Sequence, residues 1–394
     1  MTVDPLPVPA HLALLPNGFE DVLPQQAEHE AQVIERLIAC FAGYGYARVK
    51  PPLLEFEETL FAGPGAKVAG QTFRLMDPVS QGMMGLRADI TPQVARIATT
   101  RLRKAPRPLR LCYAGQVLRV SGTQLRAERQ FAQAGVELIG APSLKADAEM
   151  VLLAADALGS IGVSGLSIDL SLPPLVRDIC LGLGMGAAQV DGLRDALDRK
   201  DAAAVAALAG SHQDLFGALL RAAGPAETAL ERLSALDMPP EASDRVQSLR
   251  AIVAEIRDTN PDLALTLDPV EHRGFEYQTG ASFTLFAQGA RGELGRGGRY
   301  MAPGAKGQGE PAAGFTLYMD SVLRALPHRP APARVFIPAG MGAAGGIAAL
   351  RAEGWIALRD LSETVVGEEQ ARAEARRLGC THILTETGIV GLED

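Results

Sequence analysis

Arg119, Gln133 and Glu137 place a cation, an amide and a carboxylate within one short segment, residues 110–140. The segment has the pattern of two apolar strands joined by an arginine-rich turn. Side chains alternate along a strand, so Gln133 and Glu137 share one face of the returning strand, and Arg119 on the outgoing strand can point toward them. An arginine binds a carboxylate through two parallel hydrogen bonds, and a glutamate accepts one from an ammonium or a ring N–H. The three side chains therefore suit a small zwitterion such as an amino acid, although a surface hairpin with ordinary charges has the same pattern.

Other familiar catalytic and metal-binding patterns are missing from the sequence. The six histidines show no HExxH or HxH spacing, the four cysteines form no CxxC pair, and no GxSxG elbow is present. The glycine-rich segment 287–300 has Tyr300 where a dinucleotide fingerprint needs glycine, so it favours a flexible turn between antiparallel strands. Asp89 and Glu137 are an acid/base pair only if the fold brings them together. We expect neither a metal site nor a cofactor.

Length and composition predict a globular protein of two to three domains. The chain has 394 residues, of which 47% are hydrophobic and 21% charged. A net charge of −8 argues against a surface shaped as a whole for nucleic acid, and the basic run 101–110 is expected to be a solvated loop after a helix. The N-terminus lacks the basic and apolar regions of a signal peptide, and no run of 18 apolar residues occurs. These features predict a cytoplasmic protein with reduced cysteines and no membrane segment.

The segment 110–140, which carries Arg119, Gln133 and Glu137, is expected to lie in a sheet flanked by helices. Helical spacing of apolar residues predicts helices at 25–44 and 145–161, and the helix at 90–102 is predicted to have Thr91 as its N-cap and Pro92 at its first position. Strands are predicted at 72–76, 82–86, 166–172, 263–267 and 277–286. The segment 47–56 carries two prolines, which is typical of an edge strand or a subunit contact.

Two regions have a different character. Residues 173–261 are rich in alanine and leucine and short of strand-forming residues, which predicts an inserted helical subdomain. After a proline-rich linker, residues 334–394 alternate strand and helix patterns, as in a small α/β module with a parallel sheet. We therefore expect an α+β core domain at 1–328 with the insertion at about 173–261, and a small C-terminal α/β domain at 329–394.

The order of these segments resembles histidyl-tRNA synthetase, a class II aminoacyl-tRNA synthetase, over nearly the whole chain. The resemblance is carried by LPNGFEDVLP, GYGYARVKPPLLEFEETLF with a central Pro51 or Pro52, LRADITPQVAR, Arg119 with FAQAGVELIG, HRGFEYQTG, GELGRGGRY and AAGFTLYMD. It implies a class II antiparallel sheet and pairing of two chains through the first motif. It also implies that the C-terminal module is truncated relative to the synthetase's anticodon-binding domain.

Three departures from the synthetase pattern concern ATP and the histidine signature. The third motif of a synthetase ends in an arginine that contacts the ATP γ-phosphate, and Ser321 stands at that position here. The second motif has an acid two residues after its arginine, where this chain has Ser121, and Gln278 replaces the second tyrosine of the histidine signature. Histidine-facing residues are thus largely kept, while ATP-facing residues are changed.

This asymmetry resembles a paralogous family, the regulatory subunits of ATP phosphoribosyltransferase. The resemblance implies a non-catalytic subunit that forms a hetero-oligomer with a short-form catalytic subunit, is required for the first step of L-histidine biosynthesis, and confers feedback inhibition by histidine. The same resemblance implies a histidine site in which Asp89 and Thr91 hold the α-ammonium, Arg119 and Gln133 meet the carboxylate, Glu137 and Tyr277 contact the imidazole, and Arg273 and Gln278 complete the set. Alternatively, Arg273 pairs with a neighbouring glutamate and Tyr277 belongs to the core.

Two other functions remain as alternatives. An active histidyl-tRNA synthetase is opposed by Ser321, Ser121 and the short C-terminal module. An adaptor that binds tRNA with the same fold is opposed by the acidic balance of the chain and by the truncated tail.

Overall fold

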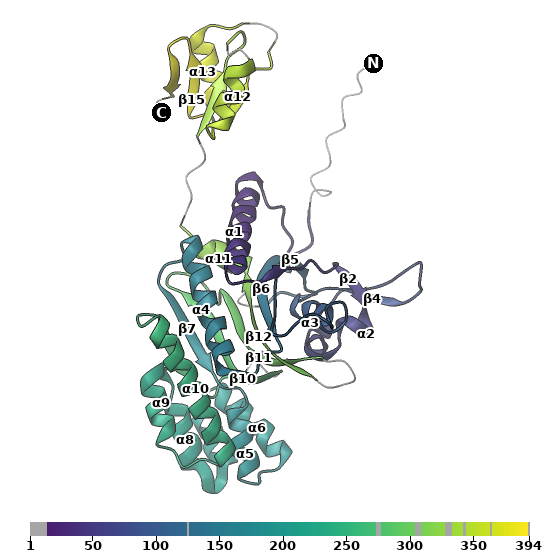
Figure 1. Ribbon diagram of the computed structural model, residues 1–394, viewed down its shortest axis with the longest axis vertical. Helices are drawn as coiled ribbons and strands as arrows, with labels where there is room; N and C mark the ends of the chain where they lie inside the picture. Colours follow the sequence, from purple (N-terminus) through teal and green to yellow (C-terminus); the bar gives the residue numbers. More distant parts are fainter. Residues whose placement is uncertain are drawn as a thin grey trace. The chain divides into compact units, whose positions relative to one another are not determined.

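The computed structural model describes residues 14–123, 126–272, 277–303, 309–327, 333–341, 344–362 and 365–392. The chain divides into two compact units, Met1–Pro327 and His328–Asp394 (Figure 1). Within the described ranges, no helix is long and apolar enough to cross a membrane.

A nine-stranded sheet forms the centre of the first unit. Its strands lie in the order β1-β5-β6-β12-β11-β10-β7-β9-β8, and neighbours are antiparallel except for the pairs β1–β5 and β7–β9. The strands are β1 (Ala47–Arg48), β5 (Leu109–Leu118), β6 (Gln130–Ile139), β7 (Leu166–Ser171), β8 (Gly224–Pro225), β9 (Ala264–Asp268), β10 (Gln278–Ala287), β11 (Gly295–Ala302) and β12 (Glu310–Tyr318). The predicted sheet around the hairpin of β5 and β6 is therefore present, with β12 next to β6 and β11 next to β12.

Helices cover both faces of this sheet, and each face has its own hydrophobic core. On one face α1 (Pro24–Gly43), α4 (Leu144–Ile161) and the short α11 (Met319–Ala325) pack with even-numbered residues of β6 such as Val136. On the other face α3 (Thr91–Thr99) packs with odd-numbered residues such as Tyr113 and Phe131. Alternation along the strands separates the two cores, because neighbouring residues point to opposite faces.

The predicted insertion is a compact set of helices. It contains α5 (Leu175–Gly182), α6 (Ala187–Asp198), α7 (Ala202–Ala209), the 3₁₀ turn η3 (Gly210–His212), α8 (Gln213–Arg221), α9 (Ala226–Ser234) and α10 (Pro240–Thr259). Asp201 caps α7 by accepting a hydrogen bond from the Ala204 N–H at 3.0 Å. Figure 1 shows α10 beside α4, which joins this subdomain to the core of the sheet.

The proline-bearing segment 47–56 contributes one strand to each of two sheets. Its first part is the edge strand β1, as predicted, and its last part is β2 (Leu54–Phe56) of a separate small sheet in the order β2-β4-β3. The other strands are β3 (Arg74–Met76) and β4 (Met83–Leu86), and α2 (Glu57–Leu60) and the 3₁₀ helix η2 (Gly63–Gln71) connect β2 to β3.

The prediction of a flexible turn over the whole glycine-rich segment 287–300 was wrong. The chain turns between Ala287 and Gly295, but Gly295, Gly297 and Gly298 lie within β11. A β-carbon at Gly297 would overlap the ring of Phe283 and lie 2.6 Å from Cβ of Phe315. Neighbouring side-chain and backbone atoms leave no room for a β-carbon at these three positions, so the glycines belong to a closely packed strand and do not mark a flexible turn.

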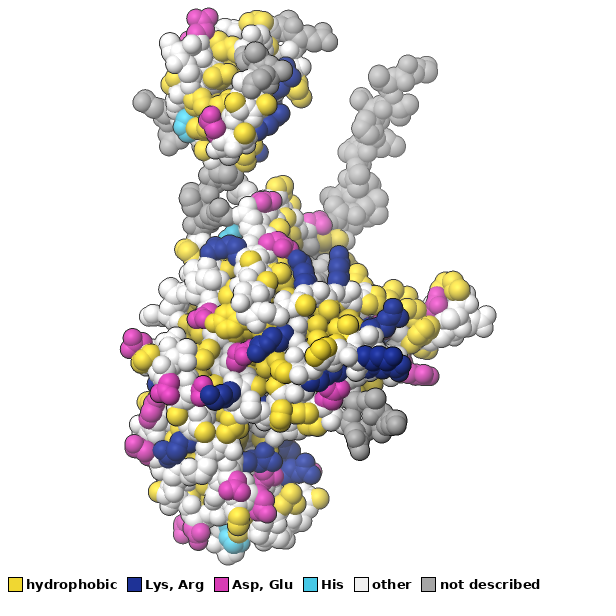
Figure 2. All heavy atoms as spheres, viewed as in Figure 1, with side chains coloured by type: hydrophobic (Ala, Val, Ile, Leu, Met, Phe, Trp, Pro, Cys, Tyr) yellow, Lys and Arg dark blue, Asp and Glu magenta, His cyan; other side chains and the backbone are white. Residues whose placement is uncertain are grey.

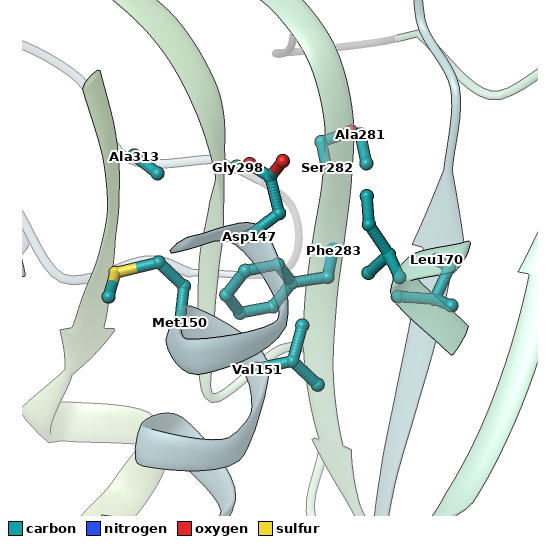
Figure 3. A pocket seen from close by; sticks show the side chains of 10 residues that line it. Asp147, Met150, Val151, Leu170, Ala281, Ser282, Phe283, Gly298 and Ala313 are labelled. Carbon is teal, nitrogen blue, oxygen red and sulfur yellow. The ribbon is translucent and has the colours of Figure 1, made fainter. Parts of the chain in front are cut away.

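A small cavity lies between the sheet and α4, on the face opposite the candidate pocket (Figure 3). Asp147, Met150 and Val151 of α4 face Phe283 and Leu170 of the sheet. The Asp147 carboxylate accepts hydrogen bonds from Nε of Arg299 at 2.9 and 3.0 Å, and both side chains are largely buried. This ion pair fixes α4 to β11.

The second unit is a four-stranded sheet in the order β14-β13-β15-β16. Its elements are β13 (Arg334–Ile337), α12 (Ala344–Ala352), β14 (Ile356–Arg359), α13 (Glu368–Arg377), β15 (His382–Thr385) and β16 (Gly388–Gly391). The strands β14, β13 and β15 are parallel, as the alternating pattern predicts, and β16 adds an antiparallel edge.

Candidate functional site

The register of the sheet places the predicted pocket residues in a row across neighbouring strands. On β6, Gln133 pairs with Tyr318 of β12, Gly135 with Thr316, and Glu137 with Gly314. Directly paired residues share a face, so Gln133 and Glu137 lie with Thr316 and Tyr318 on the side that α3 also faces. The predicted grouping of Gln133 with Glu137 on one face is therefore confirmed.

Glycines form the floor of a pocket on this face. A β-carbon at Gly314 would overlap the Glu137 carboxylate and lie 2.5 Å from the Val136 carbonyl oxygen. A β-carbon at Gly298, which has a φ of +152°, would lie 2.7 Å from Oε1 of Gln278. The bare backbone leaves the space that these two polar side chains use. The described residues that line the pocket are Thr91, Glu137, Tyr277, Gln278, Arg296, Gly297, Gly298, Tyr300, Gly314, Phe315 and Thr316.

Glu137 is the most strongly perturbed acid of the pocket. Its side chain is almost fully buried, and Oε2 accepts a hydrogen bond from the Tyr300 hydroxyl at 2.8 Å. Burial raises the pKa of Glu137 to about 8, although the hydroxyls of Tyr300 and Thr91 lower it in part and Asp89 raises it further. Glu137 is thus a buried carboxyl group that can donate or accept a proton near neutral pH.

The start of α3 brings Asp89 and Thr91 to the same region. The prediction of Thr91 as the N-cap of this helix was wrong, because the helix begins at Thr91 and its N-cap is Ile90. The Thr91 N–H donates to Oδ1 of Asp89 at 2.9 Å. The Thr91 hydroxyl lies 3.1 Å from the Tyr113 hydroxyl, which lies 2.7 Å from Oγ1 of Thr316. Burial raises the pKa of Asp89, while the Thr91 N–H and the charge of Arg119 act in the opposite direction. Hydroxyl groups and two acids therefore converge beside the glycine floor.

Gln133 and Gln278 each present a buried polar atom without a hydrogen-bond partner in the described part of the chain. Oε1 of Gln133 accepts from the Ile90 N–H at 3.1 Å, which leaves its Nε2 unsatisfied. Oε1 of Gln278 is unsatisfied as well. Gln133 is fully buried and Gln278 is 8% exposed, so leaving these atoms unpaired is costly. A bound polar ligand would remove that cost.

Two tyrosines, Tyr277 and Tyr300, form an aromatic wall of the pocket. Their rings meet edge to face with centroids 5.9 Å apart. Tyr277, Gln278 and Glu137 therefore lie together, as the prediction requires. The predicted site residue Arg273 lies outside the described residues.

Arg119 lies beside the pocket rather than in its lining. Its guanidinium carbon is 5.0 Å from the centroid of the Phe131 ring. Burial raises the pKa values of Asp89 and Tyr318, and the positive charge of Arg119 partly offsets this rise in both. The contact with Phe131 holds the cation at the end of β5, near the acid at the start of α3.

The guanidinium of Arg126 lies beside the Ser321 side chain. Its Nε donates to Oδ2 of Asp320 at 2.9 Å, its Nη2 donates to the Ser321 hydroxyl at 3.2 Å, and its guanidinium lies 4.0 Å from the centroid of the Tyr318 ring. The side chains of Arg126 and Asp320 are each only 9% exposed. A charge from the β5–β6 connection is therefore buried and neutralised at the start of α11.

Sequence reasoning missed seven of the lining residues, and three of these, Arg296, Tyr300 and Thr316, have polar side chains. All seven lie on β11 and β12; β12 pairs with β6 across more than 150 residues of sequence, and β11 pairs with β12. Alternation along GRGGRY and GFTLY predicts which residues of each strand share a face. It does not predict which strand lies next to β6.

Three comparisons with known proteins identify the family and the fold of this chain. A family model described as Histidyl-tRNA synthetase matches residues 18–322. Proteins named ATP phosphoribosyltransferase regulatory subunit are 54% identical to this chain in Rhodospirillum centenum, over 100% of both chains, and 54% identical in Paramagnetospirillum magneticum, over 98% of this chain and 99% of the relative. A solved structure described as an ATP phosphoribosyltransferase regulatory subunit/histidyl-tRNA synthetase from Bacillus halodurans C has a TM-score of 0.80 at 23% identity, covering 92% of this chain and 96% of that chain. The structural likeness confirms the predicted class II synthetase-like fold.

Proposed function

The chain belongs to the family of ATP phosphoribosyltransferase regulatory subunits, and on this premise we propose that it is a non-catalytic histidine sensor for a short-form catalytic subunit. In this role the two subunits together carry out the first step of L-histidine biosynthesis in the cytoplasm, and histidine bound to this chain inhibits the complex. Inhibition requires that histidine bind the inactive state of the complex more tightly than the active state.

The observation that carries the proposal is the contrast between the two halves of the site. Next to the glycine floor, the buried Glu137, the half-buried Asp89 and two unsatisfied amides offer partners for an amino acid. At Ser321, where the synthetase pattern has an arginine for ATP, Arg126 is instead paired with Asp320 and buried. A site that offers partners for histidine but lacks the arginine for the ATP γ-phosphate suits ligand sensing without turnover.

Within the pocket we assign the ligand groups by charge. The α-ammonium lies by Asp89 and Thr91, the carboxylate meets Arg119 and Nε2 of Gln133, and the imidazole lies by Glu137, Tyr277 and Gln278. The Gln133 amide supports this orientation, because its free Nε2 is a donor and a carboxylate accepts hydrogen bonds. Arg273 would complete the set.

A homodimer is proposed as the unit that binds the catalytic subunit. Exposed apolar side chains gather around β2 and β4, where Leu53, Phe56 and Met83 are each close to half exposed (Figure 2). An apolar surface next to an edge strand is the kind of surface that a second copy covers.

The test of the proposed function combines binding and turnover. Calorimetry should show histidine bound by the full-length chain, with Arg119→Ala and Glu137→Ala each weaker by at least tenfold and the exposed Arg103→Ala unchanged. Mixed with a short-form phosphoribosyltransferase, the chain should raise turnover and make it sensitive to histidine. No gain in turnover and no histidine sensitivity would refute the assignment, and histidine-dependent ATP–pyrophosphate exchange would show an active synthetase instead.

A further inference from the structure

The strand that carries Gln278 into the pocket is interrupted by a bulge. Gln278 of β10 pairs with Tyr300 of β11, and Ser282 pairs with Gly298, so the step from 278 to 282 matches the shorter step from 300 to 298. The extra residues of β10 therefore lie within 279–281. Residues of a bulge have no regular ladder partner, and bulges beside binding sites redirect side chains. The direction of the Gln278 side chain thus depends on what holds the bulge.

The bulge is packed closely against β11. A β-carbon at Gly298 would lie 2.8 Å from the Ala281 carbonyl oxygen and 2.7 Å from Oε1 of Gln278. A β-carbon at Gly280 would lie 3.1 Å from Cδ of Arg299. Strand β11 therefore supports the bulge and has no room for it to move closer.

An arginine of the helical insertion also holds the bulge. Arg245 lies on α10, and its Nη1 donates to the carbonyl oxygen of Thr279 at 3.0 Å. Its Nε donates to the carboxylate of Asp178 on α5, so one guanidinium binds both groups. The Asp178 side chain is only 17% exposed, and this ion pair keeps the guanidinium aimed at the bulge. The contact joins two helices of the insertion to the strand that enters the pocket.

Gln278 is the residue directly before Thr279, and its side chain lines the pocket. It is 8% exposed, and its Oε1 has no hydrogen-bond partner in the described part of the chain. Because peptide units are planar, fixing the Thr279 carbonyl restricts the few torsions that separate it from the Gln278 side chain. Given the proposed histidine site, we infer that Arg245 is a positioning residue that orients Gln278 for the ligand. Through this contact the helical insertion and the pocket are energetically coupled, and the coupling acts in both directions.

Calorimetric titration of the full chain with L-histidine tests the coupling. Arg245→Ala should weaken histidine binding by about 5- to 20-fold, which is within the usual range for two coupled sites. Gln278→Ala should weaken binding as well. In the Gln278→Ala background, Arg245→Ala should cause less than about a twofold further loss, because Arg245 acts through Gln278. Additive losses, or full affinity in Arg245→Ala, would overturn the role of Arg245.

Arg257→Ala is the matched control on the same helix. The Arg257 Nε donates to Glu227 at 2.6 Å, and its Nη1 donates to the carbonyl oxygen of Pro261 at 3.0 Å. Arg257 thus binds an acid and a backbone carbonyl as Arg245 does, at a different place in the insertion. Arg257→Ala should change histidine affinity by less than about twofold. An equal loss in both variants would mean that any weakening of the insertion has this effect, and would overturn the specific role of Arg245.

A second variant and a second measurement separate the contact from a folding defect. Arg245→Ala leaves the largely buried Asp178 without this partner, whereas Arg245→Ala combined with Asp178→Ala leaves no unpaired acid. The double variant should recover the unfolding temperature and keep the loss of histidine affinity. Recovery of affinity together with stability would overturn the inference.

Hydrogen exchange of the ligand-free chain tests the contact without histidine. Amides within 279–282 should exchange faster in Arg245→Ala than in Arg257→Ala, and equal rates would show that Arg245 does not hold the bulge. Absence of histidine binding by the unmodified chain would overturn the proposed function and the coupling with it. The exchange rates would still decide whether Arg245 holds the bulge.

Discussion

Replacing Glu137 with glutamine is expected to stabilise the ligand-free protein at pH 8 while weakening histidine binding. The ordinary pKa of a glutamate is 4.5, and burial raises that of Glu137 to about 8. A carboxyl group with a raised folded-state pKa contributes its full stability below pH 4.5, and this contribution is lost as the pH rises toward 8. The neutral amide keeps an acceptor for the Tyr300 hydroxyl and has no charge to desolvate.

The size of the effect follows from the two pKa values. Each unit of pKa difference corresponds to about 1.4 kcal/mol. Integrated from pH 5 to pH 8, Glu137 should reduce the free energy of unfolding by about 3.5 kcal/mol, and glutamine should remove this reduction. Glu310→Gln is the matched control, because pairing with Arg107 lowers the pKa of Glu310 and its contribution is constant over this pH range.

The choice of signal matters, since the chain has two units and one tryptophan. Trp355 lies in the second unit, so its fluorescence does not report on the pocket. Far-UV circular dichroism follows the first unit, which contains most of the helices. Urea unfolding at pH 5 and pH 8 should give a larger loss of stability for the unmodified protein than for Glu137→Gln. Parallel losses in the two proteins would refute the argument that Glu137 is buried and titrates near pH 8.

Three further substitutions test individual contacts. Tyr300→Phe removes the hydroxyl that donates to Glu137 at 2.8 Å, so calorimetry should show histidine binding weaker by about 1 kcal/mol, and unchanged affinity would exclude a role for this bond. Arg299→Leu leaves Asp147 buried and unpaired and should cost about 3 to 5 kcal/mol in urea unfolding, whereas Arg299→Leu combined with Asp147→Leu should recover most of the loss. Gly314→Ala places a β-carbon against the Glu137 carboxylate, so it should abolish histidine binding and lower the free energy of unfolding by about 1 to 3 kcal/mol. Full histidine binding by this variant would show that the backbone and side chains around Gly314 can shift to make room.

The hairpin of the site could be predicted from sequence because its information is local. Alternation in the segment 110–140 gives β5 and β6 and places Gln133 with Glu137 on one face. The helical insertion could also be predicted, since its alanine-rich composition extends over nearly 90 residues. In both cases the period of the pattern matches the period of the element.

The other half of the pocket could not be predicted in this way. Arg296 and Thr316 reach it only because β12 lies next to β6 and β11 lies next to β12, and strand order is decided by packing between distant segments. The glycines of β11 were misread as a turn, because glycine has the same local signature in a turn and in a strand under close contact. Arg119 was placed on the correct strand end, but its contact with Phe131 depends on a side-chain packing that alternation does not describe.

The glycine floor sets a direction for changing the ligand of this pocket by mutation. Every substitution at Gly298 or Gly314 adds atoms, so mutation can raise the floor but cannot lower it. A larger ligand can be accommodated only by trimming the walls, at positions such as Tyr277, Gln278 and Tyr300. A library built to broaden the ligand range should therefore vary the wall positions and keep both glycines fixed.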